Sequence, residues 1–231
     1  MSKALKIFGK VIKYSFYLVI IAINAIMLWR VLFSGDPSAI KPLISNERLV
    51  SVYSEKGNDL ILQTQKQKAL AESGRFSVTD CVFIPEADQI QITVRYNNST
   101  LRRLKEDFEL SEVPDRKDEL FDVTIVKTTD LTPDNDEDNT KRENLKEERF
   151  YPSYEAKTVY TKLYTYKKFV FEDIKWNDAI GLFVDIYYNG DMDYASSPYD
   201  VLCIYDSRMD MEERELSRKD KKALRNTEVG N

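Results

Sequence analysis

The chain has 231 residues, of which 42% are hydrophobic, and this suffices for one folded domain. It contains no histidine, which excludes Ser-His-Asp and Cys-His catalytic sites, histidine metal ligands and histidine-based pH switches. Its seven glycines form neither a dinucleotide fingerprint nor a phosphate loop. We therefore expect no enzymatic activity, no cofactor and no resident metal.

The charge is divided unevenly along the chain. Residues 1–33 hold five basic and no acidic residues, so the net charge of −5 for the whole chain corresponds to −10 for residues 34–231. An acidic domain is a poor ligand for nucleic acid, and we expect no nucleic-acid partner.

Residues 14–33 are almost continuously apolar, and no charge lies between Lys13 and Arg30. At 1.5 Å per residue, roughly 20 helical residues match a bilayer core of about 30 Å, so this stretch predicts a single transmembrane helix. The basic residues 1–13 predict a cytoplasmic N-terminal stub and an extracytoplasmic domain after the helix. Arg30 can extend its side chain to the interface beside Trp29.

A cleaved signal peptide is the alternative interpretation of the same N-terminus. Its apolar segment usually has about 7 to 15 residues and is followed by an A-x-A-like cleavage site. The apolar run here is longer, and RVLFSGDPSA has no such site. We therefore favour an uncleaved signal anchor.

Asn24 is the one strongly polar side chain in this stretch. It could form a helix–helix contact by hydrogen bonding to a partner helix, with Ala22 and Ala25 beside it. Alternatively, a monomeric anchor tolerates a single asparagine.

Residues 34–74 predict a linker followed by short helices, the second of them through QTQKQKALAES. Residues 75–208 predict the folded domain, because several runs alternate apolar and polar residues as half-buried strands do. In DQIQITVRYNN, the residues from Ile90 to Tyr96 alternate in this way, and Pro85–Asp88 predicts a hairpin turn before them. The run 157–174 is long enough for one extended or bent strand.

Residues 130–150 are polar and predict a mobile acidic loop, with a brief helix allowed in its second half. Residues 209–231 predict a charged tail, either as a solvated helix or as disorder.

Six or seven short strands with few helices predict a mainly β fold, an antiparallel β-sandwich of immunoglobulin-like type. The layout of basic stub, single span, linker and sandwich is similar to membrane-anchored extracytoplasmic immunoglobulin-like modules of bacteria. The resemblance lies in the arrangement alone, and it implies no functional residue.

Cys81 and Cys203 are the only cysteines and lie in the first and last predicted strands of the domain. In an oxidising compartment they could form a disulfide, which for a loop of about 120 residues contributes on the order of 4 to 5 kcal/mol in the chain-entropy model. Two buried free thiols are the alternative.

Three further patterns are compatible with a ligand site, but none of them is specific for one. Asp134, Asp136 and Asp138 resemble the start of a calcium loop but lack its later glycine and glutamate, and Asp191 and Asp193 are similarly incomplete. Tyr164, Tyr166, Tyr187 and Tyr188 would form a platform for a sugar or peptide if they shared one solvent-exposed face. No pair of carboxylates stands out for glycoside hydrolysis.

The sequence therefore predicts a single-pass protein of a bacterial cell membrane. Its extracytoplasmic domain would work as a binding or scaffold module whose partner is another protein or a cell-surface polymer. The alternative is an accessory subunit of a membrane complex that is recognised through its transmembrane helix. A carboxylate-based hydrolase is a third class and would need two carboxylates about 5 to 10 Å apart in a pocket.

Overall fold

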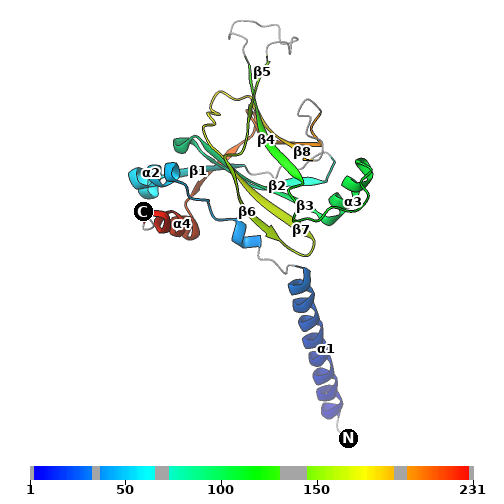
Figure 1. Ribbon diagram of the computed structural model, residues 1–231. Helices are drawn as coiled ribbons and strands as arrows, with labels where there is room; N and C mark the ends of the chain where they lie inside the picture. Colours follow the sequence, from blue (N-terminus) through cyan, green and yellow to red (C-terminus); the bar gives the residue numbers. More distant parts are fainter. Residues whose placement is uncertain (1–2, 33–36, 66–72, 131–144, 190–196, 229–231) are drawn as a thin grey trace.

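The computed structural model describes residues 3–32, 37–65, 73–130, 145–189 and 197–228. Two antiparallel β-sheets form the domain, and the N-terminal helix α1 stands apart from them (Figure 1). The six-stranded sheet, called sheet A below, has the order β10-β1-β2-β3-β7-β6, and the four-stranded sheet B has the order β5-β4-β8-β9. The prediction of a mainly β, sandwich-like fold with antiparallel sheets is confirmed.

The strands in chain order are β1 Ile61–Gln65, β2 Phe76–Ile84, β3 Gln89–Asn97, β4 Phe121–Asp130, β5 Leu145–Phe150, β6 Tyr154–Tyr160, β7 Tyr164–Phe171, β8 Gly181–Tyr188, β9 Asp200–Asp206 and β10 Met211–Glu215. The α-helices are α1 Lys3–Leu32, α2 Glu47–Lys56, α3 Asn98–Asp107 and α4 Arg218–Glu228. Short 3₁₀ turns lie at η1 Pro37–Ile40, η2 Gly57–Asp59 and η3 Pro85–Ala87.

The main core lies between the two sheets. On β3 the apolar residues Ile90, Ile92 and Val94 face it, as the two-residue period predicts. Aromatic rings fill its ends: Phe76 meets Phe121 edge-on at 4.9 Å between ring centroids. In a strand whose sequence alternates, every second side chain therefore points into the core between the two sheets.

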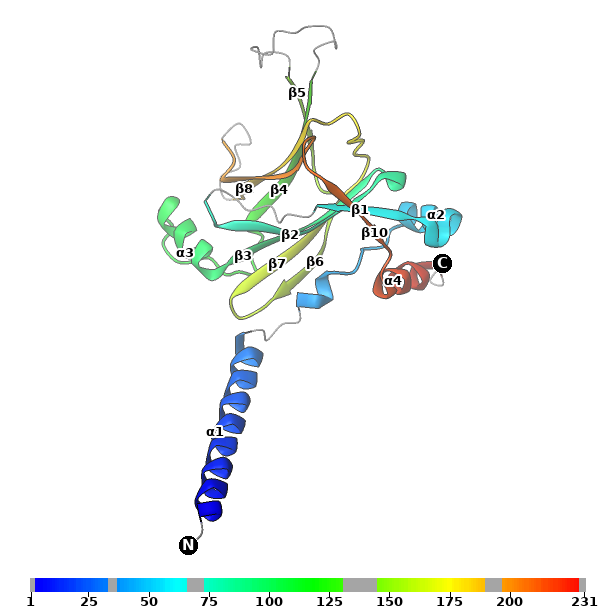
Figure 2. The same ribbon diagram turned by 180° about the vertical axis from the view of Figure 1, so that it is seen from behind.

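A second core lies on the outer face of sheet A. There α2 and α4 lie side by side (Figure 2) and bury Leu49, Leu216 and Leu224 against Val82 and Ile84. The outer face of this sheet is therefore covered at the end where β1 and β10 lie.

Of two hairpin turns in sheet A, one was predicted from the sequence and the other was not. The predicted turn between β2 and β3 is present, and Asp88 adopts the left-handed conformation there with φ 46°. The single strand predicted over 157–174 is wrong, because the chain reverses between β6 and β7. Thr161 makes this turn: its amide donates to the carbonyl oxygen of Tyr164 at 2.8 Å, and its hydroxyl accepts from the Tyr164 amide at 3.0 Å.

Three segments differ from the predicted organisation. Residues 145–150 of the expected acidic loop form β5, an edge strand paired with β4, while residues 131–144 lie outside the described residues. The predicted helix through residues 63–73 is replaced at its start by β1. The expected tail 209–231 contains β10, paired with β1, and α4, whose Leu224 is fully buried.

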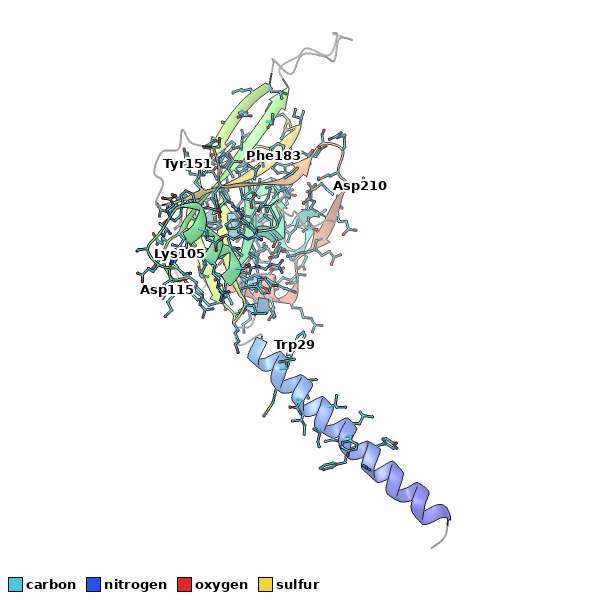
Figure 3. All side chains as sticks on the ribbon, turned by 90° about the vertical axis from the view of Figure 1, so that its right-hand side faces the viewer. Trp29, Lys105, Asp115, Tyr151, Phe183 and Asp210 are labelled. Atoms are coloured by element: carbon cyan, nitrogen blue, oxygen red, sulfur yellow. The ribbon has the colours of Figure 1, made fainter. Side chains whose placement is uncertain are left out.

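Helix α1 is confirmed as a helix over Lys3–Leu32. Its side chains are described from residue 13 to residue 29, and every one of them is exposed; the large apolar ones are 39% to 69% exposed. Figure 3 shows these side chains projecting on all sides, with Trp29 near the domain. Among the described residues, no helix combines the length and the apolar character needed to cross a membrane. The transmembrane assignment of 14–33 is thus unsupported by that finding.

Candidate functional site

Residues 38–45, called the crossing segment below, join the region of α1 to α2 by passing over the outer face of sheet A. The side-chain amide of Gln91 on β3 pairs with the backbone of Ile44: it accepts from the Ile44 amide at 2.9 Å and donates to the Ile44 carbonyl at 2.8 Å. The Leu43 amide donates to Asp220 Oδ1 at 2.8 Å, and Lys157 Nζ donates to the Ala39 carbonyl at 2.7 Å. Polar side chains of the domain therefore hold this segment in place.

Lys168 on β7 is the central residue of this attachment. Its side chain is 0% exposed, and its ammonium donates to the carbonyl oxygens of Ile40 at 3.2 Å and Pro42 at 2.9 Å. Asp80 Oδ2 on β2 lies 3.7 Å from the same ammonium. Burial lowers the pKa of Lys168, while the nearby Asp80 carboxylate opposes that shift. The buried cation is thus compensated by carbonyl dipoles and by one carboxylate.

A cavity of about 400 Å³ opens beside the crossing segment, and its volume lies within the range of roughly 300 to 1,000 Å³ typical of small-molecule sites. Strand pairing brings its walls together: Asp80 lies opposite Thr93, which lies opposite Lys168, and Arg95 lies opposite Tyr166. The residues that line it are Ile40, Lys41, Thr79, Asp80, Arg95, Tyr166 and Arg214.

The lining is polar and carries more positive than negative charge. The lining includes three basic residues, Lys41, Arg95 and Arg214, and one carboxylate, that of Asp80. Arg214 also pairs with the buried Asp220 at 3.1 Å, beyond the lining itself. Since residues 34–231 are acidic as a whole, this cavity is an exception to the charge of the domain.

Arg95 is held in place by its neighbours. Its Nε donates to Ser77 Oγ at 3.0 Å, and its guanidinium lies 4.7 Å from the centroid of the Tyr164 ring. The rings of Tyr164 and Tyr166 are 6.3 Å apart between centroids. A smaller recess of about 50 Å³ lies on the Ser77 side of Arg95. The guanidinium therefore has a fixed position at the edge of the cavity.

Two buried atoms of the lining have no hydrogen-bond partner among the described residues. They are Asp80 Oδ2, an acceptor whose ion-pair partner Lys168 Nζ lies beyond hydrogen-bond distance at 3.7 Å, and Arg214 Nε, a donor. A buried polar group without a partner costs free energy, about 1 to 3 kcal/mol for an unsatisfied donor or acceptor. A bound molecule would satisfy both atoms if it supplied one hydrogen-bond donor and one acceptor.

The structure has the two predicted site cysteines as free thiols. Cys81 belongs to the core between the sheets, whereas Cys203 on β9 lies between Leu202 and Ile204, which both face that core. Alternation along a strand therefore directs the Cys203 side chain away from the core. Burial raises the pKa of both thiols. The disulfide stays a prediction that this orientation does not favour.

Asn24 lies exposed on α1, where its Nδ2 donates to the Ile20 carbonyl oxygen of the preceding turn at 2.8 Å. This bond within the helix satisfies part of its hydrogen-bonding capacity, and the predicted helix–helix contact stays a prediction.

The remaining candidates are not brought together. The acidic stretches around Asp134–Asp138 and Asp191–Asp193 lie outside the described residues, within which no group of three metal-ligating side chains occurs. Tyr164 and Tyr166 lie on β7 of sheet A, whereas Tyr187 and Tyr188 lie on β8 of sheet B. The four tyrosines therefore do not share one face.

The cavity residues were missed from the sequence, although part of the signal was present. The polar positions of β3, among them Gln91, Thr93 and Arg95, alternate with the core positions and so identify the outer face of the sheet. Nothing in that alternation shows that the crossing segment covers this face.

Comparison of the chain with protein-family models, with curated proteins and with solved structures found no match in any of the three.

Proposed function

We propose that this protein is a membrane-anchored binding or scaffold module. In this proposal α1 inserts into a lipid bilayer and the two-sheet domain works on the extracytoplasmic side. One observation carries it: α1 exposes apolar side chains on all sides, while neither core of the described domain includes a residue of α1 (Figure 3). A helix that is hydrophobic all round is normally covered by protein or by lipid.

The apolar run and the flanking charges of α1 support lipid as that cover. Its uncharged residues 14–29 extend over about 24 Å at 1.5 Å per residue, and Arg30 beyond them can extend its side chain to the membrane interface. The first half of α1 carries Lys3, Lys6, Lys10 and Lys13, which favours a cytoplasmic N-terminus. The domain would then lie on the opposite side of the membrane.

The binding part of the proposal is supported by the cavity. It is formed by the crossing segment and the outer face of sheet A, so a molecule bound there would touch both the domain and the segment leading to α1. The proposal includes an immunoglobulin-like domain. This part rests only on the layout of helix, linker and two antiparallel sheets, and strand order does not contribute to it.

Extraction of cell membranes with alkaline carbonate tests the anchor. We expect the full chain to stay in the membrane pellet and a double variant, Ile21→Asp with Ile23→Asp, to be released, because each charge near the middle of a membrane helix costs roughly 2.5 to 3.5 kcal/mol. The matched control, Val113→Asp with Val201→Asp, changes exposed apolar residues of the domain and should stay in the pellet. Recovery of the unmodified chain in the supernatant would refute the anchor.

A further inference from the structure

The cavity on the outer face of sheet A has features that define a ligand class. We propose that it binds a small anion that also carries hydroxyl groups, such as an acidic or phosphorylated sugar. This inference rests on the proposed function of the domain as a binding module and gives its ligand a chemical identity.

The positive charge of the lining selects for an anion. Lys41, Arg95 and Arg214 present donors from three separate parts of the chain, the crossing segment, β3 and β10. Arginine forms paired, charge-assisted hydrogen bonds with carboxylate and phosphate groups. Arg95 is already fixed by Ser77 and Tyr164, so little of its conformational freedom would be lost on binding.

The unpartnered buried atoms explain why a simple anion is insufficient. Arg214 Nε requires an acceptor, which an anionic oxygen supplies. Asp80 Oδ2, from which Lys168 Nζ lies 3.7 Å away, lacks a donor at hydrogen-bond distance, and a plain carboxylate or a fully deprotonated anion such as sulfate has none to offer. A molecule with hydroxyl groups beside its anionic group satisfies both atoms at once.

The remaining walls suit such a molecule. The Thr79 hydroxyl donates to the Thr93 carbonyl oxygen at 3.4 Å and can still accept from a ligand, while Ile40 and the aromatic ring of Tyr166 add apolar surface. Sugars present both kinds of surface. Since Ile40 and Lys41 belong to the crossing segment, the bound ligand would also stabilise that segment on the sheet.

Calorimetric titration of the full chain, purified in detergent, tests the proposal with three probes. D-glucuronate carries both an anionic group and hydroxyl groups, succinate carries only anionic groups, and D-glucose carries only hydroxyl groups. We expect D-glucuronate to bind at least tenfold more tightly than either of the other two. Binding of D-glucuronate that is less than tenfold tighter than that of succinate or of D-glucose would overturn the proposal.

Variants locate the binding in this cavity. Lys41→Gln, Arg95→Gln and Arg214→Gln should each weaken D-glucuronate binding roughly tenfold or more, because each removes a charge-assisted hydrogen bond. Lys41 is exposed, so Lys41→Gln leaves the fold least disturbed. The matched control Arg103→Gln removes an exposed arginine of α3 outside the lining and should bind as the unmodified chain does. An equal loss in Arg103→Gln, or no loss in the three cavity variants, would overturn the proposal.

The two proposals fail separately. Absence of D-glucuronate binding by a chain that resists carbonate extraction refutes the ligand class and leaves the anchor intact. Release of the chain from membranes refutes the anchor whatever the titration shows.

Discussion

Replacing Lys168 by methionine tests whether the crossing segment is held by a buried cation. Methionine keeps the length and apolar character of the side chain but removes the ammonium that donates to the Ile40 and Pro42 carbonyl oxygens and faces Asp80. The variant leaves these acceptors without their donor and the carboxylate without its nearest cation.

The expected loss follows from the geometry. Removing one partner of a buried ion pair costs about 3 to 5 kcal/mol in unfolding free energy. The Asp80 side chain is 23% exposed, so water can solvate part of the unpaired charge, and we expect the lower end, about 3 kcal/mol. Combining Lys168→Met with Asp80→Asn should cost less than the two single changes added together, because the two side chains interact.

Urea unfolding of the full chain measures this loss. Trp176 is 7% exposed and reports on the domain, and a Trp29→Phe background removes the signal from α1. The matched control is Lys162→Met in the exposed β6–β7 turn, which should change stability by at most about 0.5 kcal/mol. A loss below about 1 kcal/mol for Lys168→Met, or one no larger than for Lys162→Met, would refute the assigned role.

Four other predictions follow. Burial raises the pKa of Tyr96 from 10.0 to about 12. The protonated phenol therefore contributes about 2 to 3 kcal/mol to the unfolding free energy, fully below pH 10 and progressively less as the pH rises to 12. Urea unfolding at pH 9, 10.5 and 12 measures the loss. Asn97→Ala should destabilise the domain by about 1 kcal/mol in urea, because Asn97 Oδ1 accepts from the Thr100 amide and caps α3. Alkylation of native, unreduced protein followed by mass spectrometry should label Cys203 before the more buried Cys81, and both once the protein is unfolded. Asn24→Leu should leave the chain in the membrane pellet and any complex with other membrane proteins intact, since its amide bonds within its own helix.

Each of these has an outcome that contradicts it. Tyr96→Phe should lose less stability than the unmodified chain above pH 10, and an identical pH profile would show that another group is responsible. For the helix cap, Asn97→Asp keeps an acceptor and should retain most of the stability lost in Asn97→Ala, so an equal loss in both variants would contradict the assigned cap. Linked peptides containing Cys81 and Cys203 would establish the disulfide. Loss of a membrane complex in Asn24→Leu would favour the accessory-subunit alternative.

The fold was predictable wherever a strand has one buried and one polar face. Strands β3 and β8 have such alternation, whereas β2 was recognised from its many β-forming residues and the turn after it; the structure contains all three. The strands β5 and β10 were not predicted, because LKEERF and MEERE are edge strands whose mostly exposed side chains give no apolar pattern. Their pairing is decided by the backbone of the neighbouring strand and leaves little trace in the sequence.

The candidate site was less predictable than the fold. Lys168 in the run YKKFVF gives no local sign that its ammonium is buried, since its compensation comes from carbonyl groups more than 120 positions earlier in the chain. Asp80 and Arg214 are ordinary charged residues until strand pairing and the crossing segment place them around one cavity. Such sites depend on tertiary packing and not on motif spacing.

The proposed function places this domain on the extracytoplasmic face of a membrane, anchored there by α1. Protease treatment of intact cells that carry the chain with a C-terminal tag tests it most directly. If the proposal is right, the tag is lost from intact cells while a cytoplasmic control protein survives. Protection of the tag until the cells are lysed would contradict it.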